Sequence, residues 1–342
     1  MKWSRVLLVA PLLAIVLVLL WWRGPDWGLV GDAFTAVSWR WIVAALGLNL
    51  LSVVARSIAW RTVVAQALPN VPEFSRVFSA FAIGLLGNAA LPARAGELAR
   101  VAVLRRRLER GRGYTATLFG TVFVHRLFDA IPAVLLVVYV LLTARVPHWA
   151  VTALVVAACV AVVLFMAALV GSRLRRPVLE DVSPVRRLAA MARQGLDVLR
   201  SPLAAAIAIF FQCVGWFCQL LAVWVAMRAF GIDAPLPAAA LVLLLMNVAT
   251  IFPLWPGNIG LLQAAVALPL VSYGVAYTTG FAYGLGLQIL EMSVGVGVGL
   301  AFLAREGISF ATLKRMPEQE QANAERAAVV REAEPARARR AV

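Results

Sequence analysis

The sequence predicts an all-α polytopic integral membrane protein with six spanning helices and two re-entrant, broken-helix hairpins, eight hydrophobic segments in all. Three observations predict this class. The 342 residues are 62% hydrophobic and only 14% charged, whereas an average soluble domain is about half apolar and about a quarter charged. Uncharged apolar stretches long enough to cross a bilayer recur along the chain. Two further apolar segments are interrupted near their centres by proline and glycine.

The net charge of +15 fits a membrane protein better than a nucleic-acid binder. A nucleic-acid binder needs a solvated basic surface on a soluble core, but here the arginines gather between apolar stretches, so we expect no nucleic-acid partner. The positive-inside rule places these basic segments and both termini on the cytoplasmic side of the membrane. We expect this membrane to be a bacterial-type cell (inner) membrane. We count Arg56 and Arg61 among the cytoplasmic charges.

Six segments are predicted to span the bilayer, because each combines helical length with few charges. They are residues 6–22, 41–60, 116–142, 149–170, 203–230 and 277–304. The first follows Lys2 and Arg5, as the apolar part of a signal peptide would. Trp21 and Trp22 stand where a small-residue cleavage site is expected. We therefore interpret 6–22 as a retained span.

The segments 76–108 and 236–272 are apolar but contain helix breakers. Their predicted tips are Asn88, Pro92 and Gly96 in the first, and Asn247, Pro256, Gly257, Asn258 and Gly260 in the second. Arginines on both sides of the first segment favour two cytoplasmic ends, and hence a re-entrant hairpin. The alternative is that each segment makes two short full crossings, which gives eight plain spans.

Residues 41–142 and 203–304 each contain the order span, hairpin, span, with opposite orientations. Inverted repeats whose interrupted helices meet near the midplane are a recurring plan of secondary transporters. We expect residues 1–312 to form this membrane domain. Residues 313–342 are rich in Ala, Glu, Arg and Gln, and we expect them to form a disordered cytoplasmic tail.

Ionisable side chains at bilayer depth are candidates for function, because a charge in lipid is costly. Arg126 and Asp129 lie three residues apart on one face of the span 116–142, and Glu291 lies at a matching depth in 277–304. We predict that they bind a lipid headgroup. The alternative is that Arg126 and Asp129 form a self-neutralising structural pair. Glu291 is expected to meet Arg126 or to take up a proton.

The first hairpin carries three further candidates for headgroup binding: Arg94, Glu97 and Arg100. They are predicted to share roughly one face of a helix that begins near Pro92. A helix start beside two guanidinium groups suits a phosphate, because its free N–H groups and the arginines all donate to oxygen. The alternative is that Glu97 pairs with both arginines and only fastens the hairpin.

Other polar residues are expected to have structural roles. Asn88 and Asn247 precede their helix breakers and are predicted to cap freed backbone groups. Gln212 and Gln219 lie seven residues apart on one face of the span 203–230, which predicts interhelical hydrogen bonds.

Catalytic and metal-binding patterns are missing from the sequence. It has no nucleophile elbow, no His-Glu-x-x-His and no phosphate-binding glycine loop. With two histidines, and three cysteines that lie in apolar stretches, we expect no metal and no cofactor. The protein is therefore predicted not to be an enzyme.

Three motifs carry a family resemblance. The stretch Gly87 to Arg100, the run Arg126 to Asp129 and the run Pro256 to Gly260 resemble, in that order, signatures of the lysylphosphatidylglycerol synthase transmembrane family. The order and spacing agree over about residues 40–305. This family includes the flippase-like half of the multiple peptide resistance factor, so the resemblance implies a stand-alone lipid-translocating member without the aminoacyl-transferase domain. His125 departs from the pattern, because it stands where a glutamate is usual.

The leading hypothesis is a flippase-like translocase for a membrane lipid, either an anionic phospholipid or a polyprenyl or glycolipid. Its headgroup would cross a polar cavity between the two hairpins. One alternative is a small-solute or proton-coupled transporter that uses Glu291. Another is a non-transporting partner of a lipid-modifying enzyme, recruited through residues 171–202. That segment has arginines and apolar residues at helical spacing, which predicts an amphipathic helix or a plain basic connector.

Overall fold

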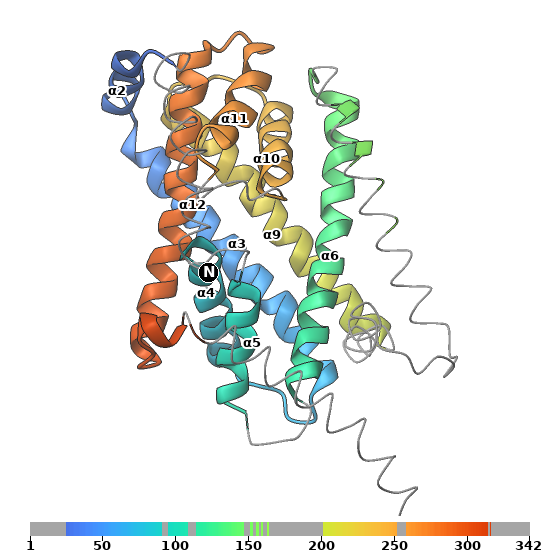
Figure 1. Ribbon diagram of the computed structural model, residues 1–342. Helices are drawn as coiled ribbons and strands as arrows, with labels where there is room; N and C mark the ends of the chain where they lie inside the picture. Colours follow the sequence, from blue (N-terminus) through green and yellow to red (C-terminus); the bar gives the residue numbers. More distant parts are fainter. Residues whose placement is uncertain are drawn as a thin grey trace, which may run out of the picture. The chain divides into compact units, whose positions relative to one another are not determined.

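The computed structural model describes residues 25–90, 95–108, 114–146, 201–251 and 258–313, with isolated residues between 151 and 163 and at position 315. All regular secondary structure in this part of the chain is helical, which confirms the all-α class. Figure 1 shows the helices, which follow one another as α2, α3, α4, α5, α6, α9, α10, α11 and α12.

Four of the described helices are long and apolar enough to cross a membrane. They are α3 (Trp39–Ala67), α6 (Tyr114–Thr143), α9 (Pro202–Ala229) and α12 (Tyr277–Arg305). At the usual helical rise each is about 42–45 Å long, against a hydrocarbon core of about 30 Å. They confirm four of the six apolar segments as helices. The expected span 6–22 lies outside the described residues, and only six residues of 149–170 lie within them.

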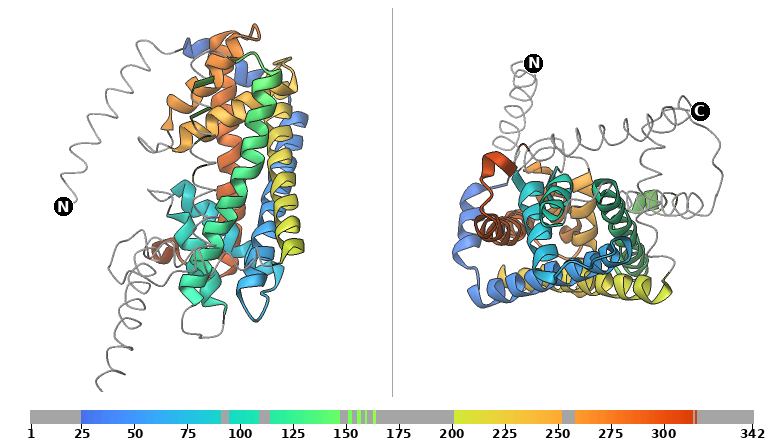
Figure 2. Two further views of the ribbon diagram at one scale, coloured as in Figure 1. Left: turned by 90° about the vertical axis from the view of Figure 1, so that its right-hand side faces the viewer. Right: turned by 90° about the horizontal axis from the view of Figure 1, so that it is seen from below.

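Five described helices are shorter: α2 (Trp27–Thr35), α4 (Phe74–Ala90), α5 (Gly96–Arg106), α10 (Leu236–Ile251) and α11 (Leu261–Val271). Each of the last four spans 11 to 17 residues, which is shorter than the about 20 residues a spanning helix needs. α4 packs against α5, and α10 packs against α11 (Figures 1 and 2). Each interrupted segment therefore folds into a pair of short neighbouring helices.

The contacts divide the chain into two compact units. The α10–α11 unit is made of Met1–Ser52, Pro132–Val162 and Trp216–Val294, and the α4–α5 unit of Val53–Ile131, Val163–Gly215 and Gly295–Val342. The boundaries fall inside α3, α6, α9 and α12, so each long helix contributes to both units. Each unit takes residues from both expected repeats, and the repeats 41–142 and 203–304 stay a prediction. The expected tail lies almost entirely outside the described residues.

The α10–α11 unit is built around α10. Every side chain from Ala238 to Met246 is at most 4% exposed, because a helix that is apolar on all faces is stable only when it is surrounded. Residues of α9 and α12, among them Met227 and Leu287, complete this core. The Tyr283 hydroxyl donates to the Val223 carbonyl at 2.8 Å, which satisfies a polar group that is otherwise buried.

The α4–α5 unit depends on glycines where its two short helices meet. A Cβ on Gly96 would lie 2.0 Å from the Gly84 carbonyl oxygen and 2.4 Å from the Asn88 nitrogen, and one on Gly87 would lie 2.7 Å from the Gly96 Cα. Real side chains do not approach so closely, so the two backbones touch only because these positions lack a Cβ. This contact fixes the start of α5 against α4.

Helix α12 also packs on α4 in this unit. A Cβ on Gly299 would lie 2.4 Å from the Leu86 Cβ, and the rings of Phe78 and Phe302 meet edge to face with centroids 5.1 Å apart. Close approach at small residues is the usual way in which membrane helices associate.

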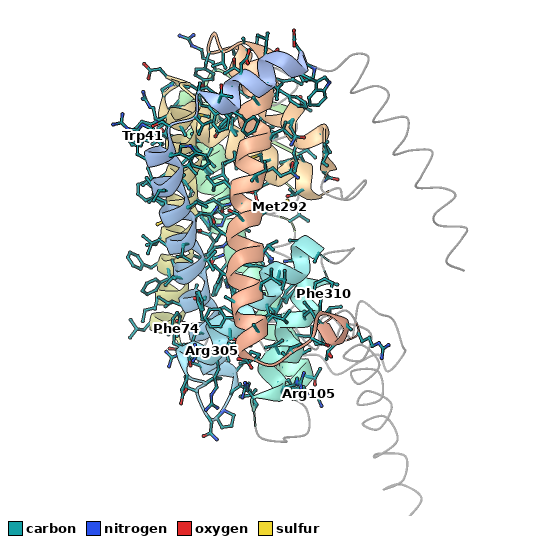
Figure 3. All side chains as sticks on the ribbon, turned by 90° about the vertical axis from the view of Figure 1, so that its left-hand side faces the viewer. Trp41, Phe74, Arg105, Met292, Arg305 and Phe310 are labelled. Atoms are coloured by element: carbon teal, nitrogen blue, oxygen red, sulfur yellow. The ribbon has the colours of Figure 1, made fainter. Side chains whose placement is uncertain are left out.

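Large apolar side chains are exposed along these helices. Trp41 is 37% exposed, Phe74 38%, Met292 44% and Phe310 47%, and Figure 3 labels all four. In the most apolar stretch of each of the four long helices only 28–39% of the residues are buried within the protein, and such contiguous exposed apolar surface is rare in soluble proteins. Such surfaces fit helices that face lipid.

Candidate functional site

The charged pair that the sequence singled out lies on α6. Arg126 and Asp129 are one helical turn apart, and Arg126 Nη1 donates to Asp129 Oδ2 at 3.1 Å. The ion pair that we considered as a structural alternative therefore forms. Both residues also have partners on other helices, so the pair is not self-contained.

Asp129 is bound by two other helices of the α4–α5 unit. Arg56 on α3 donates from Nη2 to Asp129 Oδ1 at 2.9 Å, and Gln212 on α9 donates from Nε2 to the same oxygen. The second bond confirms the interhelical hydrogen bond expected for Gln212. Asp129 is only 9% exposed, and a buried carboxylate needs such donors to remain ionised.

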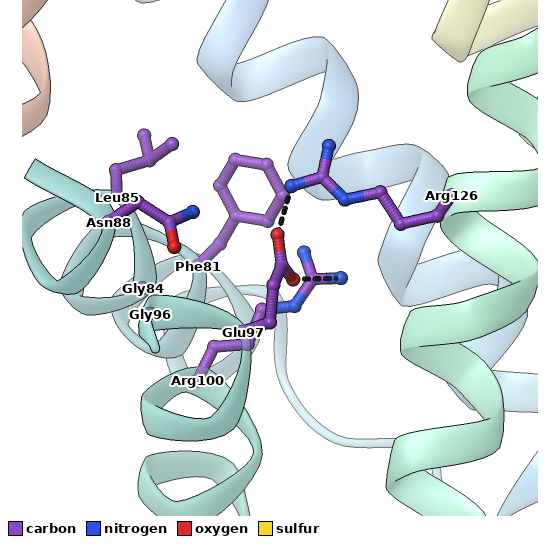
Figure 4. Close-up of a pocket in the computed structure, with 8 residues that line it drawn as sticks. All are labelled: Phe81, Gly84, Leu85, Asn88, Gly96, Glu97, Arg100 and Arg126. Atoms are coloured by element: carbon purple, nitrogen blue, oxygen red, sulfur yellow. Dashed lines mark hydrogen bonds and ion pairs between the residues drawn. The ribbon is translucent and has the colours of Figure 1, made fainter. Parts of the chain in front are cut away.

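Glu97 links the first turn of α5 to α6. Its Oε1 accepts from Arg126 Nη2, and its Oε2 lies 2.8 Å from Arg100 Nη2 (Figure 4). An acidic side chain in the first turn of a helix is also favoured by the free backbone N–H groups there. The alternative in which Glu97 pairs with both arginines of the first hairpin is met for Arg100, whereas Arg94 lies outside the described residues. The second partner of Glu97 is Arg126.

Arg100 is buried between aromatic rings. It is 3% exposed, and its guanidinium carbon lies 4.7 Å from the centre of the Trp60 ring and 5.6 Å from that of Phe81. Ring faces attract a guanidinium group. Trp60 is itself held by a hydrogen bond from Nε1 to Thr121 Oγ1 at 3.2 Å. These contacts fix Arg100 in place.

The described cluster contains three guanidinium groups (Arg56, Arg100 and Arg126) and two carboxylates (Glu97 and Asp129), which leaves one net positive charge. A small pocket of about 20 Å³, with room for about one water molecule, adjoins it. It is lined by Phe81, Gly84, Leu85, Asn88, Gly96, Glu97, Arg100 and Arg126 (Figure 4). The Arg126 side chain is 45% exposed. Chemically, such a site can bind an anion by charge and by hydrogen bonds from guanidinium.

The sequence matches the family described as lysylphosphatidylglycerol synthase TM region over residues 7–299. The chain belongs to this family. Family membership and the long apolar helices together make it a multi-pass membrane protein. The matched region includes all five residues of the charged cluster. Comparisons with curated proteins and with solved structures gave no significant match.

The start of α5 corrects one expectation about the family's first signature. The helix begins at Gly96, with Ala95 as its N-cap, and not near Pro92. At this start Gly96 lies in close contact with Gly84 and Asn88 of α4. Glu97 and Arg100 are therefore on α5, whereas Arg94 and Pro92 lie outside the described residues.

The two asparagines before the breaks differ in their contacts. Asn88 Oδ1 is buried, with no hydrogen-bond partner in the part of the chain that the structure describes. Asn247 donates to the Leu243 carbonyl at 2.8 Å, one turn earlier in α10. Capping of the backbone at 91–94 and 252–257 stays a prediction, because those residues lie outside the described ranges.

The tip of the second interrupted segment is described from Asn258 onward. Asn258 has a φ of 45° and donates to the Ala249 carbonyl at 3.1 Å, which ties the tip back to α10. Gly260 has a φ of 91°, a conformation that favours glycine, and its N–H donates to Gln263 Oε1 at 2.6 Å. The expected tip residues Pro256 and Gly257 lie outside the described part.

Glu291 lies on α12 in the α10–α11 unit. It accepts from Gln219 Nε2 at 3.4 Å, which confirms the interhelical hydrogen bond expected for Gln219. One turn earlier, Gln288 accepts from Gln263 Nε2 at 2.6 Å. The expectation that Glu291 meets Arg126 or takes up a proton stays a prediction.

Three residues of the site were missed in the sequence. Arg56, which the positive-inside rule assigns to the cytoplasmic charges, lies in the middle of α3 and pairs with Asp129. Its position inside the apolar span 41–60 was the available signal. Trp60 and Phe81 had no such signal, because aromatic residues are ordinary in apolar helices.

His125, at the position where the family pattern has a glutamate, is buried in the α4–α5 unit. It is 1% exposed, and its ring meets that of Phe81 edge to face with centroids 5.9 Å apart. Nδ1 has no hydrogen-bond partner among the described residues. The acids of the cluster are Glu97 and Asp129.

Proposed function

We propose that the chain is a flippase-like translocase that moves an anionic or glycosylated lipid headgroup across the membrane. The observation that carries this proposal is the charged cluster in the α4–α5 unit, where Arg126 remains 45% exposed beside a pocket while its partners are mostly buried. Membership of the family supports a lipid-related role.

The charge of the cluster supports transport rather than architecture alone. A charge at the bilayer centre costs about 2.5–3.5 kcal/mol by insertion scales. One pair of opposite charges is enough to hold two helices together, whereas this cluster has five ionised groups and one net positive charge. A phosphate group would balance that charge and accept hydrogen bonds from Arg126.

The short helices support the finer topology that we propose. We infer that α4–α5 and α10–α11 are re-entrant hairpins, because none of these helices is long enough to span the core. With six spanning helices, the two hairpins enter from opposite sides in an inverted repeat, and both termini are cytoplasmic in a bacterial-type cell membrane. Irregular backbone at membrane depth is tolerated where it lines a polar cavity.

Transport in this proposal needs no covalent chemistry, and the chain acts as a carrier and not as an enzyme. The sequence has no phosphate-binding glycine loop, so we expect movement that is passive, driven by a gradient or driven by a partner. The acyl chains stay in the bilayer while the headgroup crosses the polar region.

The test is lipid translocation in proteoliposomes. Purified full-length protein is reconstituted with phosphatidylglycerol that carries a fluorophore, and the fraction that a membrane-impermeant quencher reaches is followed over time. We expect faster translocation than in protein-free liposomes. We also expect a loss of about tenfold or more in Arg126→Ala, because a charge-assisted hydrogen bond contributes about 1.5–3 kcal/mol.

Arg76→Ala is the matched control. The Arg76 side chain is 47% exposed, close to the value for Arg126, and belongs to the same unit. It should translocate lipid like the wild type. If Arg126→Ala and Arg76→Ala both match the wild type, the proposed function is wrong.

A second candidate is a proton-coupled small-solute transporter that uses Glu291. It is favoured by the hydrogen bond between this carboxylate and Gln219 at a polar position of α12. This candidate expects solute uptake that does not depend on phospholipid, and coupling that Glu291→Gln abolishes. Lipid translocation unchanged in Glu291→Gln would separate the two candidates.

A further inference from the structure

We propose that Glu97 is an internal competitor for Arg126, and that a phosphate-bearing headgroup binds by taking its place at the Arg126 guanidinium. This inference rests on the proposed function and adds how the same site recognises its ligand. Glu97 does not contact the ligand in the bound state. It holds the site closed in the free state.

The exposure of the three side chains gives the exchange a direction. Arg126 is 45% exposed, Glu97 22% and Arg100 4%. The contact between Glu97 and Arg126 is therefore at the open end of the cluster, and the contact between Glu97 and Arg100 is at its buried end (Figure 4). An anion that enters from outside meets Arg126 first.

The exchange leaves no charged group unpaired. After release, Glu97 keeps Arg100, at 2.8 Å, and Arg126 keeps Asp129, at 3.1 Å. Breaking a buried ion pair outright costs about 3–5 kcal/mol, because one charge is left without compensation. Here the incoming phosphate replaces one carboxylate with another anion on the same guanidinium, so that cost does not arise.

Arg100 is the fixed partner in this exchange. It is 3% exposed, and the faces of Trp60 and Phe81 hold its guanidinium. Arg100 lines the inner wall of the pocket, but its side chain is only 4% exposed, so an external anion meets Arg126 first. Arg100 is therefore a positioning residue that keeps Glu97 within reach of Arg126.

The pocket beside Glu97 is nearly closed in the free state. Its volume of about 20 Å³ holds about one water molecule, so a phosphate enters only when Glu97 leaves Arg126, and the acyl chains remain outside. The buried Asn88 Oδ1 in its wall lacks a hydrogen-bond partner among the described residues. A hydroxyl beside the phosphate would satisfy it.

The test compares Glu97→Gln with the wild type by calorimetric titration of the full chain in detergent. One arm uses inorganic phosphate and the other uses a short-chain phosphatidylglycerol. Removing the competitor is expected to tighten binding about tenfold, since one charge-assisted contact no longer has to be displaced. Arg126→Gln should bind neither probe. If Glu97→Gln raises the affinity for phosphatidylglycerol alone, the site recognises a lipid headgroup. If it raises the affinity for both probes, the site recognises the phosphate group itself.

Glu73→Gln is the matched control, because it removes the same charge from an exposed side chain of the same unit. Its binding should equal that of the wild type. An equal gain in Glu73→Gln would show that net charge alone is responsible, and would overturn the inference. No gain in Glu97→Gln with either probe would also overturn it.

Glu97→Gln leaves Arg100 buried without its carboxylate. A second variant therefore tests the inference in case Glu97→Gln does not fold. Glu97→Gln combined with Arg100→Gln removes both members of the buried pair, and the same gain is expected. The inference and the proposed function fail separately. If Glu97→Gln binds the probes more tightly but Arg126→Ala translocates lipid like the wild type, only the proposed function is rejected. If Arg126→Ala loses translocation but Glu97→Gln does not bind more tightly, only the exchange is rejected.

Discussion

Arg56 and Asp129 are 73 residues apart in the chain, and they meet across α3 and α6 with an Nη2–Oδ1 distance of 2.9 Å. Their side chains are 20% and 12% exposed. Because Asp129 also holds Arg126 and Gln212, this ion pair connects the exposed end of the cluster to α3 and α9. The stability of the unit should therefore depend on Arg56.

We predict that Arg56→Ala destabilises the protein by about 1–3 kcal/mol, because Asp129 loses one charge-assisted donor but keeps two others. Arg56→Lys should recover part of this loss. Arg40→Ala removes an exposed arginine from the same helix and should change stability by less than about 0.5 kcal/mol. Unfolding in detergent, followed by circular dichroism, measures all three. Equal stability of Arg56→Ala and Arg40→Ala would contradict the prediction.

Hydrophobicity and helix breakers were sufficient to predict most of the fold. The four long helices follow from apolar length alone, and the division of the two other apolar segments into α4 and α5 and into α10 and α11 follows from their proline and glycine residues. The start of α5 was placed too early, because the contact that fixes it joins Gly96 to α4 and is not visible in local sequence.

The site was predicted less completely than the fold. Arg126, Asp129, Glu97 and Arg100 could be singled out, since charges in apolar segments are rare. Arg56 lies near the end of the predicted span 41–60, where the positive-inside rule assigns an arginine to the cytoplasm. It is central only in the longer helix that the structure shows, Trp39–Ala67. Pairing between α3 and α6 depends on tertiary packing, which the local pattern does not contain.

Gly96→Ala tests the contact between α4 and α5. The new Cβ would lie 2.0 Å from a backbone oxygen of Gly84, so the helices must separate. We expect a loss of at least about 1–3 kcal/mol, the usual effect of overpacking. Gly47→Ala is the control, because a Cβ there meets nothing within 4 Å. It should leave the melting temperature unchanged or raise it slightly, since alanine favours helix. Similar melting temperatures for the two variants would count against the tight contact.

Glu306 predicts a pH dependence at the end of α12. Burial disfavours its charged form, but hydrogen bonds from Arg107 Nε at 2.7 Å and from Ser79 Oγ at 2.8 Å outweigh this and lower the pKa of the Glu306 carboxyl. Because the pKa of Glu306 is lower in the folded state, its charged form stabilises the protein at pH values above the ordinary glutamate pKa of 4.5. This stabilisation is lost as the pH falls through the lower pKa of the folded state.

Melting temperatures of the wild type and Glu306→Gln, measured from pH 7 to pH 3, check this prediction. The wild type should be the more stable at pH 7, by a margin that is constant down to about pH 5 and shrinks below it. A margin that does not change between pH 7 and pH 3 would show that the charge of Glu306 has no part in it.

Trp60→Leu tests how Arg100 is held. The variant loses the ring face 4.7 Å from the guanidinium and the hydrogen bond to Thr121. We expect destabilisation of about 2–4 kcal/mol, because a fully buried tryptophan is replaced by a smaller side chain. Trp39→Leu, at a tryptophan that is 74% exposed on the same helix, should be nearly neutral. Thermal unfolding in detergent compares them, and equal effects would argue against a special role for Trp60.

Native mass spectrometry of the gently purified protein shows most directly whether the Arg126 cluster holds an anionic lipid. The wild type and Arg76→Ala should retain a phosphate-bearing lipid, and Arg126→Ala should lose it. If Arg126→Ala retains the same lipid to the same extent, the cluster does not bind the headgroup and its buried charges serve only to hold the helices together.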